Sequence, residues 1–184
     1  MEIDSNPWQI LKKETTYENN WVKVIHHEVL KPNQEPGVYG VVDFKNIAVG
    51  IIPLDEFGYT WLVGQYRFPI QEYSWEIPEG GCLKGHEAPI DAARRELLEE
   101  VGLIAHNWSE MGTIHTSNSV CNEVGYYFLA ENLTHVESSP EDTEILKIQR
   151  VHLKKAVEMV LNNEITDSIS IAAILKVAKF KQLL

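Results

Sequence analysis

Cysteine is scarce in this sequence, and its scarcity excludes two kinds of stabilisation. Only Cys82 and Cys121 occur in 184 residues, in unrelated contexts and without the CxxC spacing of a thiolate metal site. A disulfide framework therefore has no support, and a reducing cytoplasm suits both thiols.

Long apolar runs are missing as well. Nowhere do about 18 apolar residues follow one another, which disfavours a transmembrane helix. The opening residues, MEIDSNPWQILKKE, lack the basic start and the apolar stretch of an export signal. We therefore expect an unexported protein of the cytoplasm with no membrane partner.

Positive charge is also in short supply. Sixteen Lys and Arg residues face 27 Asp and Glu residues, which gives a formal net charge of −11. This charge repels a polyanion over long range, so we expect no nucleic-acid partner. A small anionic substrate fits only if a cation lies between it and the protein. The motifs GxSxG, Walker A, HExxH and GxGxxG are absent.

The elements that are present fit one globular domain with a small appended element. Runs rich in Val, Ile and aromatic residues predict strands over 21–30, 37–44, 46–54, 59–68, 125–133 and 145–153. Apolar spacings of three and four predict helices over 88–101, 154–162 and 168–181. Strands followed and separated by helices predict an α/β fold with a mixed sheet covered by helices on both faces.

The helix expected over 88–101 has clear ends and an acidic stripe. Pro89 stands where a first-turn proline is tolerated, and Gly102 follows the last apolar residue of the pattern. Glu96, Glu99 and Glu100 share one side of the helix, next to its apolar face. Such a stripe is usually only a solvated surface. A divalent cation is the alternative, because it relieves repulsion between carboxylates at the edge of a core.

A glycine-rich loop precedes this helix and completes a longer motif. Residues 81–103, GCLKGHEAPIDAARRELLEEVGL, resemble the Nudix box of nucleoside diphosphate hydrolases at every fixed position. Those positions are Gly81, Glu87, Arg95, Glu96, Leu97, Glu99, Glu100, Gly102 and Leu103. A match of this length in one register is far more specific than a lone glycine motif.

The resemblance implies a Nudix fold, a mixed β-sheet sandwiched between α-helices, and a box that binds Mg²⁺ or Mn²⁺. Glu96 and Glu100 would be the principal metal ligands, Glu99 a ligand directly or through water, and the Gly80 carbonyl a further ligand. Arg95 would be a structural partner, as would Glu87. The reaction would be attack of water on one phosphorus of a diphosphate, which needs cations because the substrate is negatively charged.

The residues before the box resemble those of ADP-ribose and nucleoside diphosphate sugar hydrolases. In LVGQYRFPIQEYSWEIPEGG, the likeness makes Arg67 and Glu76 candidates for substrate binding, although a strand-edge ion pair is the alternative. Residues 1–45 resemble an N-terminal β extension that serves dimerisation and base binding, ahead of a Nudix domain over 46–184. By this likeness we expect a homodimer, with Trp21 stacking on the base and Trp8 as the second choice.

The same resemblance is incomplete after the box. ADP-ribose-preferring members usually carry a proline about sixteen residues beyond it, whereas this sequence has none between Pro89 and Pro140. GDP-mannose and other nucleotide sugars therefore stay open as substrates. Glu123 matches an acidic position near the substrate, with a surface glutamate as the alternative.

The general base in such relatives lies on a loop between late strands. The acidic stretch SSPEDTEIL makes Glu144 the first candidate, and Glu141 or Asp142 the next. The box residues Glu99 and Glu100 are rivals for the same role, and Arg95 is counted with the catalytic group.

Two other functions stay open at this point. One is a Nudix hydrolase of a different nucleotide, such as a dinucleoside polyphosphate, coenzyme A or a nucleoside triphosphate. The other is a non-catalytic module that binds a nucleotide sugar and regulates a partner. The second predicts losses among the box carboxylates, and this sequence has none.

Overall fold

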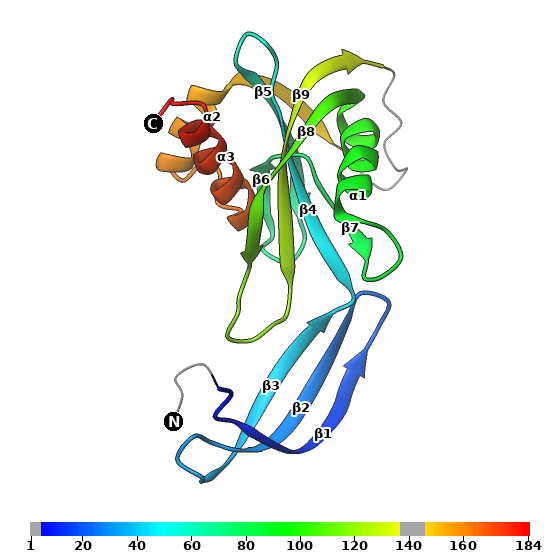
Figure 1. Cartoon of the computed structure of the whole chain (residues 1–184), viewed down its shortest axis with the longest axis vertical. Coiled ribbons are helices and arrows are strands. Elements are labelled where there is room, and N and C mark those ends of the chain that lie inside the picture. Colours follow the sequence, from blue (N-terminus) through cyan, green and yellow to red (C-terminus); the bar gives the residue numbers. More distant parts are fainter. Residues whose placement is uncertain (1–4, 137–145) are drawn as a thin grey trace. The chain divides into compact units, whose positions relative to one another are not determined.

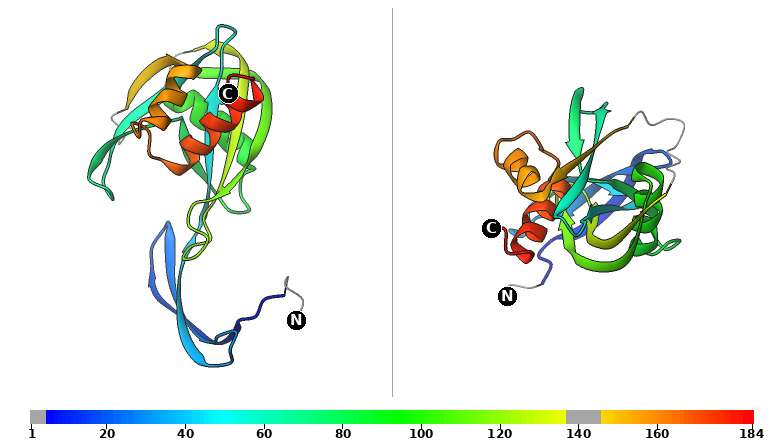
Figure 2. Two further views of the ribbon diagram at one scale, coloured as in Figure 1. Left: turned by 90° about the vertical axis from the view of Figure 1, so that its left-hand side faces the viewer. Right: turned by 90° about the horizontal axis from the view of Figure 1, so that it is seen from above.

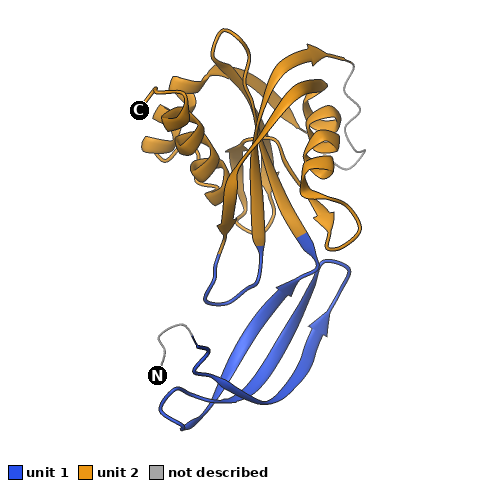
Figure 3. Ribbon diagram, viewed as in Figure 1, with its two compact units in different colours: residues 1–46, 117–123 blue, residues 47–116, 124–184 orange. Residues whose placement is uncertain are grey.

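The computed structural model describes residues 5–136 and 146–184, and the chain divides into two compact units (Figure 3). One unit holds residues 1–46 and 117–123, and the other holds residues 47–116 and 124–184. The family resemblance places a boundary between 45 and 46, and it does not separate 117–123 from the residues around it.

The first unit is a three-stranded antiparallel sheet (Figure 1). Its strands are β1 (Gln9–Glu18), β2 (Val22–Leu30) and β3 (Pro36–Phe44), in that order. The strands predicted over 21–30 and 37–44 are confirmed and pair antiparallel, with Val22 opposite Phe44 and Leu30 opposite Pro36. The strand pattern did not predict β1, because its residues are exposed on both faces and therefore show no alternation of apolar and polar positions.

Backbone hydrogen bonds join residues 117–123 to β3. The Val42 N–H donates to the Val120 carbonyl at 2.9 Å, and the Asn122 N–H donates to the Val42 carbonyl at 3.2 Å. The Asn122 side chain also accepts from the Phe44 N–H at 2.8 Å. These bonds satisfy the free edge of β3 and explain why the segment clusters with the first unit.

The second unit contains two sheets with the orders β7-β4-β9-β8 and β10-β5-β6. Their strands are β4 (Asn46–Pro53), β5 (Tyr59–Arg67), β6 (Glu72–Glu76), β7 (Glu79–Leu83), β8 (Leu103–His115), β9 (Val124–His135) and β10 (Lys147–His152). β4 and β9 run parallel, and β8 pairs antiparallel with β9. The four-stranded sheet is therefore mixed, as predicted, and the sheet β10-β5-β6 is antiparallel. The strands β6, β7 and β8 were not expected from the strand pattern.

Helices cover both sides of these strands (Figure 2). α1 (Pro89–Glu96) lies on one side, and α2 (Leu153–Leu161) and α3 (Ser168–Phe180) lie on the other. Alternate residues of β5 point to the two sides: Trp61 and Val63 join the core under α1, whereas Leu62 joins the core under α2 and α3. Each such buried side chain contributes roughly 1.5–3 kcal/mol. The predicted α/β fold, a mixed sheet between helices, is confirmed.

The helix of the box is not regular along its whole length. α1 begins at Pro89 and ends at Glu96, and a π-helical turn, η1 (Leu97–Val101), continues it. Gly102 closes the turn in the left-handed conformation with φ 68°, as expected of a glycine at this position. The predicted extent is therefore right, but the last turn is wider than an α-helix. Such π turns occur frequently at functional sites.

The two C-terminal helices begin at capping side chains. His152 accepts from the Lys154 N–H at 3.2 Å ahead of α2, and Asp167 accepts from the Ser170 N–H at 2.7 Å ahead of α3. Both helices lie where the apolar spacing predicted them. Within the described ranges, no helix has the length and apolar character needed to cross a membrane.

Candidate active site

The three box glutamates differ in burial. Glu96 is the last residue of α1, and Glu99 and Glu100 belong to η1. Glu100 is only 4% exposed, whereas the side chains of Glu96 and Glu99 are 14% and 29% exposed. A carboxylate is rarely buried to this extent without a partner. The stripe is therefore not a solvated helix face.

The backbone of Glu79, Gly80 and Gly81 lies directly against two of these carboxylates. The Glu79 N–H donates to Oε2 of Glu100 at 3.1 Å, and the Gly81 N–H donates to Oε1 of Glu96 at 3.3 Å. A Cβ atom at Gly80 would lie 1.9 Å from the carboxyl carbon of Glu96. Glycine is therefore required here, because only it allows backbone and carboxylate to approach so closely.

Arg95 is the cation at the centre of this cluster. One of its guanidinium nitrogens donates to Glu96 at 2.7 Å and to Glu99 at 3.0 Å. The other donates to the Gly81 carbonyl at 3.0 Å and to Glu87 at 3.4 Å. The guanidinium thus joins the helix to the glycine loop.

Burial also affects the titration of the cluster. It raises the pKa of the Glu96 carboxyl group, and the neighbouring charge of Glu99 adds to the rise, although Arg95 and the Gly81 N–H act against it. A second cation near Glu96 would relieve this cost of burying charge.

The donor atoms of the cluster fit a hard divalent cation. Carboxylate oxygens of Glu96, Glu99 and Glu100 and the backbone of Gly80 lie around one loop, and Mg²⁺ and Mn²⁺ prefer oxygen ligands. Within residues 5–136 and 146–184, no three His, Cys, Asp or Glu side chains converge closely enough to enclose an ion by themselves. Arg95 is the cation that pairs with Glu96 and Glu99 in this arrangement.

Arg67 and Glu76, predicted together as binding residues with a strand-edge ion pair as the alternative, do form an ion pair at the ends of β5 and β6. Nε of Arg67 donates to both carboxylate oxygens of Glu76 at 3.0 Å, and a terminal nitrogen makes a third contact. Glu76 is buried, while the Arg67 side chain is 39% exposed. Hydrogen bonding to Glu76 raises the pKa of Arg67, and the charges of Glu79 and Asp167 raise it further. Arg67 therefore lies near the glycine loop as a fixed cation that is open to solvent.

Sequence reasoning missed a group of three polar side chains, of which Ser170 is buried and Glu79 and Asp167 are half-buried. Glu79, Asp167 and Ser170 contact one another, and burial raises the pKa of the Glu79 carboxyl group well above its ordinary value of 4.5, with Asp167 adding to the rise. No sequence signal pointed to this group, because Glu79 is 91 positions from Ser170 and shares no motif with Asp167 and Ser170.

The remaining predicted residues belong to other parts of the chain. Trp21 and Glu123 belong to the first unit, where Trp21 is 65% exposed in the turn between β1 and β2 and Glu123 is half-buried. Trp8 is less exposed, at 37%, and its ring packs edge-on against Tyr39. Glu144, together with Glu141 and Asp142, lies outside the described residues.

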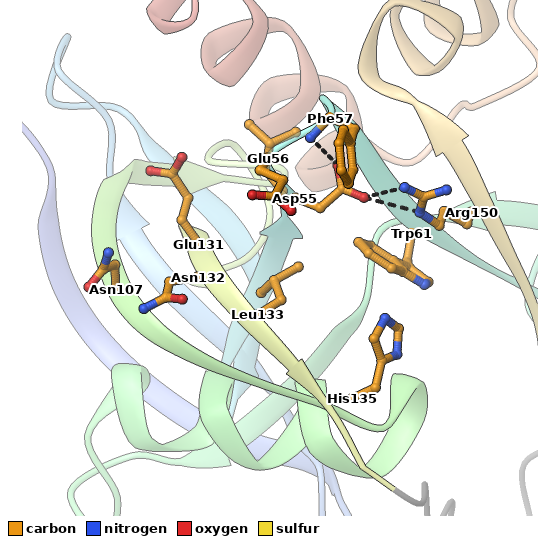
Figure 4. Close-up of a pocket in the computed structure, with 11 residues that line it drawn as sticks. Asp55, Glu56, Phe57, Trp61, Asn107, Glu131, Asn132, Leu133, His135 and Arg150 are labelled. Atoms are coloured by element: carbon orange, nitrogen blue, oxygen red, sulfur yellow. Dashed lines mark hydrogen bonds and ion pairs between the residues drawn. The ribbon is translucent and has the colours of Figure 1, made fainter.

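A cavity of about 820 Å³ occupies another part of the second unit (Figure 4). The turn after β4, Asn107 of β8, residues 131–133 and 135 of β9, and Arg150 of β10 line it together with Trp61. Arg150 is fixed there by two contacts to Asp55 and lies 3.9 Å from the ring centroid of Tyr59. None of the predicted site residues is in its wall, so the box cluster and this cavity use separate sets of residues.

Comparison with known families decides the identity of the fold and of the box. A model of the NUDIX domain matches residues 44–171, which is more than half of the chain. The chain belongs to the Nudix family. A second model, described as the nucleoside diphosphate sugar hydrolase N-terminal domain, matches residues 8–42. The predicted family is confirmed, and the chain is a Nudix hydrolase.

Relatives of this Nudix protein match most of its length. It is 29% identical over 160 residues to an ADP-ribose pyrophosphatase of Bacillus subtilis, covering 86% of this chain and 85% of that one. It is 34% identical over 133 residues to an ADP-ribose pyrophosphatase of Mycobacterium tuberculosis, covering 71% of this chain and 64% of that one. The crystal structure of an ADP compounds hydrolase shares the fold, with a TM-score of 0.85, 20% identity, and coverage of 95% and 94%.

Proposed function

We propose that this Nudix hydrolase cleaves the diphosphate bond of a nucleoside diphosphate sugar, such as ADP-ribose or GDP-mannose, to a nucleoside monophosphate and a sugar phosphate. The main support is one observation. The carboxylates of Glu100 and Glu96 accept hydrogen bonds from the backbone N–H groups of Glu79 and Gly81, and the charge of Glu79 acts in turn on the fixed cation Arg67. The N-terminal match over residues 8–42 supports the choice of substrate class.

In this proposal, Glu96 and Glu100 are the principal ligands of Mg²⁺ or Mn²⁺, and Glu99 and the Gly80 carbonyl complete the protein's donors. The metal, when bound, neutralises phosphate oxygens and favours attack by water. Arg95 holds the helix and the loop together, so that the donors keep their geometry when the substrate arrives. Its charge also limits the repulsion between Glu96 and Glu99.

Arg67 binds the diphosphate in this scheme. Its guanidinium offers several N–H donors, and the buried carboxylate of Glu76 fixes their direction before the substrate binds. A preformed cation of this kind suits a phosphate oxyanion. Glu123 is proposed to lie near the substrate as well, as the family likeness implies.

The general base is proposed to be Glu144, with Glu141 and Asp142 as neighbouring alternatives and Glu99 and Glu100 as rivals in the box. A carboxylate that accepts a proton from water loses this ability when it is replaced by its amide. Glu144→Gln is therefore expected to lower kcat with little change in KM. An unchanged kcat would assign the role of general base to Glu99 or Glu100 of the box.

The first 45 residues are proposed to serve base binding and dimerisation, ahead of the hydrolase domain over 46–184. Five large apolar side chains of this part are more than half exposed: Ile10, Leu11, Tyr17, Trp21 and Val38. Apolar side chains gathered on one small sheet favour a protein contact. A monomer in sedimentation experiments at micromolar concentration would argue against the dimer.

Trp21 is the proposed stacking residue, with Trp8 second. Its indole is exposed and therefore available to a base, whereas Trp8 already packs against Tyr39. Trp21→Ala is expected to raise KM about tenfold, in line with the roughly 1–3 kcal/mol that base stacking contributes. A rise in KM on Trp8→Ala alone would exchange the two assignments. Localisation in the cytoplasm is proposed from the scarcity of cysteine, and cell fractionation tests it.

The decisive experiment is a substrate panel with purified protein and Mg²⁺ or Mn²⁺. It contains ADP-ribose, GDP-mannose, UDP-glucose, dinucleoside polyphosphates, coenzyme A and nucleoside triphosphates, with release of monophosphate as the readout. Turnover of at least one nucleotide sugar is expected. Turnover of triphosphates alone would overturn the choice of substrate, and no turnover of any compound would favour a binding module.

A further inference from the structure

A serine far from the box in sequence is bonded to the loop that carries it. Ser170, in the first turn of α3, is completely buried. Its hydroxyl accepts a hydrogen bond from the Ile77 N–H at 3.0 Å and donates one to Oε1 of Glu79 at 2.8 Å. A single hydroxyl therefore donates to and accepts from one three-residue segment, 77–79, which runs from the end of β6 to the first residue of β7.

The serine is itself held in place from the other side. Asp167 caps α3 by accepting from the Ser170 N–H at 2.7 Å. The carboxyl group of Glu79 also makes a hydrogen bond with Asp167. Ser170 therefore has no free rotation that would let its hydroxyl follow a moving loop, because its backbone and its side chain are both engaged.

The same three-residue segment leads directly into the box cluster. Glu79 uses its side chain on Ser170 and its backbone N–H on Oε2 of Glu100 at 3.1 Å. The next residue, Gly80, packs against the carboxylate of Glu96 with no space for a Cβ atom. A displacement of Glu79 would therefore move the Gly80 carbonyl relative to both Glu96 and Glu100.

We propose that Ser170 is a positioning residue of the metal site, acting through Ile77 and Glu79 on the Gly80 carbonyl and Glu100. The start of α3 thereby sets the spacing of oxygen donors that belong to a different part of the chain. This inference rests on the metal role proposed above for Glu96 and Glu100. Groups that orient metal ligands without touching the metal typically change metal affinity by 10–100-fold when they are replaced.

A purely structural role makes a different prediction. If Ser170 only satisfies a buried N–H group, its loss lowers stability without a specific effect on metal binding. Val177→Ala is the control for this case, because Val177 is completely buried in the same helix and its truncation lowers stability through packing alone. Ser168→Ala is the control for residue type, because Ser168 is an exposed serine in the same turn.

The experiment measures Mn²⁺ binding to the full chain by electron paramagnetic resonance, together with the thermal midpoint of each variant. Ser170→Ala is expected to weaken Mn²⁺ binding about tenfold, whereas Val177→Ala and Ser168→Ala bind as the unchanged protein does. Ser170→Thr keeps the hydroxyl and is expected to restore binding. If the alanine variant does not fold, Ser170→Cys provides the comparison, because a thiol is a weaker donor and acceptor of similar size.

Equal Mn²⁺ affinities for Ser170→Ala and Val177→Ala would overturn the proposal. For substrates that are turned over, the Mg²⁺ concentration for half-maximal rate should rise in Ser170→Ala while KM stays within about twofold. Mn²⁺ binding does not depend on the identity of the substrate. The result therefore stays distinct from a failure of the proposed function, which the substrate panel reveals in the unchanged protein.

Discussion

Glu79 and Glu100 are joined by a single hydrogen bond, in which the backbone N–H of Glu79 donates to Oε2 of Glu100 at 3.1 Å. Glu100 is almost completely buried, and Glu79 is the first residue of β7. The bond therefore fixes a buried carboxylate of the π-helical turn against the start of a strand. It places the acidic helix and the glycine loop in one cluster. The effects expected of Glu100→Gln and Gly80→Ala both depend on this cluster.

Glu100→Gln is expected to lower kcat by about two to three orders of magnitude while the fold is retained. An amide keeps an oxygen that can accept from Glu79, but it loses the charge that a divalent cation requires. The measurement is kcat at saturating Mg²⁺, with circular dichroism as the test of folding. Asp91→Asn is the matched control, because Asp91 is an exposed carboxylate on α1 that pairs with Arg94. Equal rates for the two variants would remove Glu100 from the metal site.

Gly80→Ala is expected to lower activity about a hundredfold, because the added methyl group would overlap the carboxyl group of Glu96. Relaxation of that overlap displaces either the loop or the glutamate, and displacements near 1 Å at an active site cost about this much. Gly40→Ala in β3 is the control, since a Cβ atom there meets nothing within 4 Å. Activity assays of both variants test the claim. A fully active Gly80→Ala protein would show that the close contact is unimportant.

Arg67→Lys is expected to raise KM at least tenfold with a smaller change in kcat. A lysine cannot make the forked contacts to a carboxylate and a phosphate that a guanidinium makes. Glu76→Gln should produce a milder rise, because Arg67 would keep its charge but lose its fixed direction. Steady-state kinetics with the preferred nucleotide sugar provides the measurement. Arg94→Lys, an exposed arginine of α1, is the control and should leave KM unchanged.

Asp55→Asn is expected to lower stability in a pH-dependent way. Burial acts to raise the pKa of Asp55, but Arg150 and the N–H groups of Tyr59 and Phe57 outweigh it, so the pKa lies below the ordinary 3.8. A carboxyl group with a lowered pKa in the folded state stabilises the protein above the unfolded value, and the contribution is lost as the pH falls through the folded value.

At about pH 7, Asp55→Asn should lower the free energy of unfolding by roughly 1 kcal/mol, or Tm by about 2–4 °C. The effect is this small because Arg150 is partly exposed and its charge is screened. The difference in Tm between the unchanged protein and Asp55→Asn should shrink below pH 3.8. Calorimetry at several pH values measures this difference in Tm. Glu56→Gln is the control, because Glu56 is an exposed carboxylate next to Asp55. A difference in Tm that stays constant down to pH 2 would contradict the assignment.

Local patterns predicted the elements that carry an apolar period. The stripe of the box helix, its proline start and its Gly102 stop all lie within a short stretch of chain, so sequence alone could predict its extent. The strands β1 and β8 escaped the strand pattern because most of their residues are exposed, and an exposed strand needs no alternation of apolar and polar residues. The π-helical turn escaped as well, since its residues differ in no obvious way from those of an α-helix.

The sequence by itself determined the family, the α/β class, and the glutamates that form the box cluster, because a motif in one register is a local property of the chain. Only the tertiary structure decided which carboxylate is buried, that Arg67 pairs with Glu76, and that Ser170 of α3 holds the loop before the box. These relationships join residues on different elements. They depend on the packing of α3 against the sheets, which decides the acceptor that each buried donor contacts. A local sequence pattern does not predict these partners.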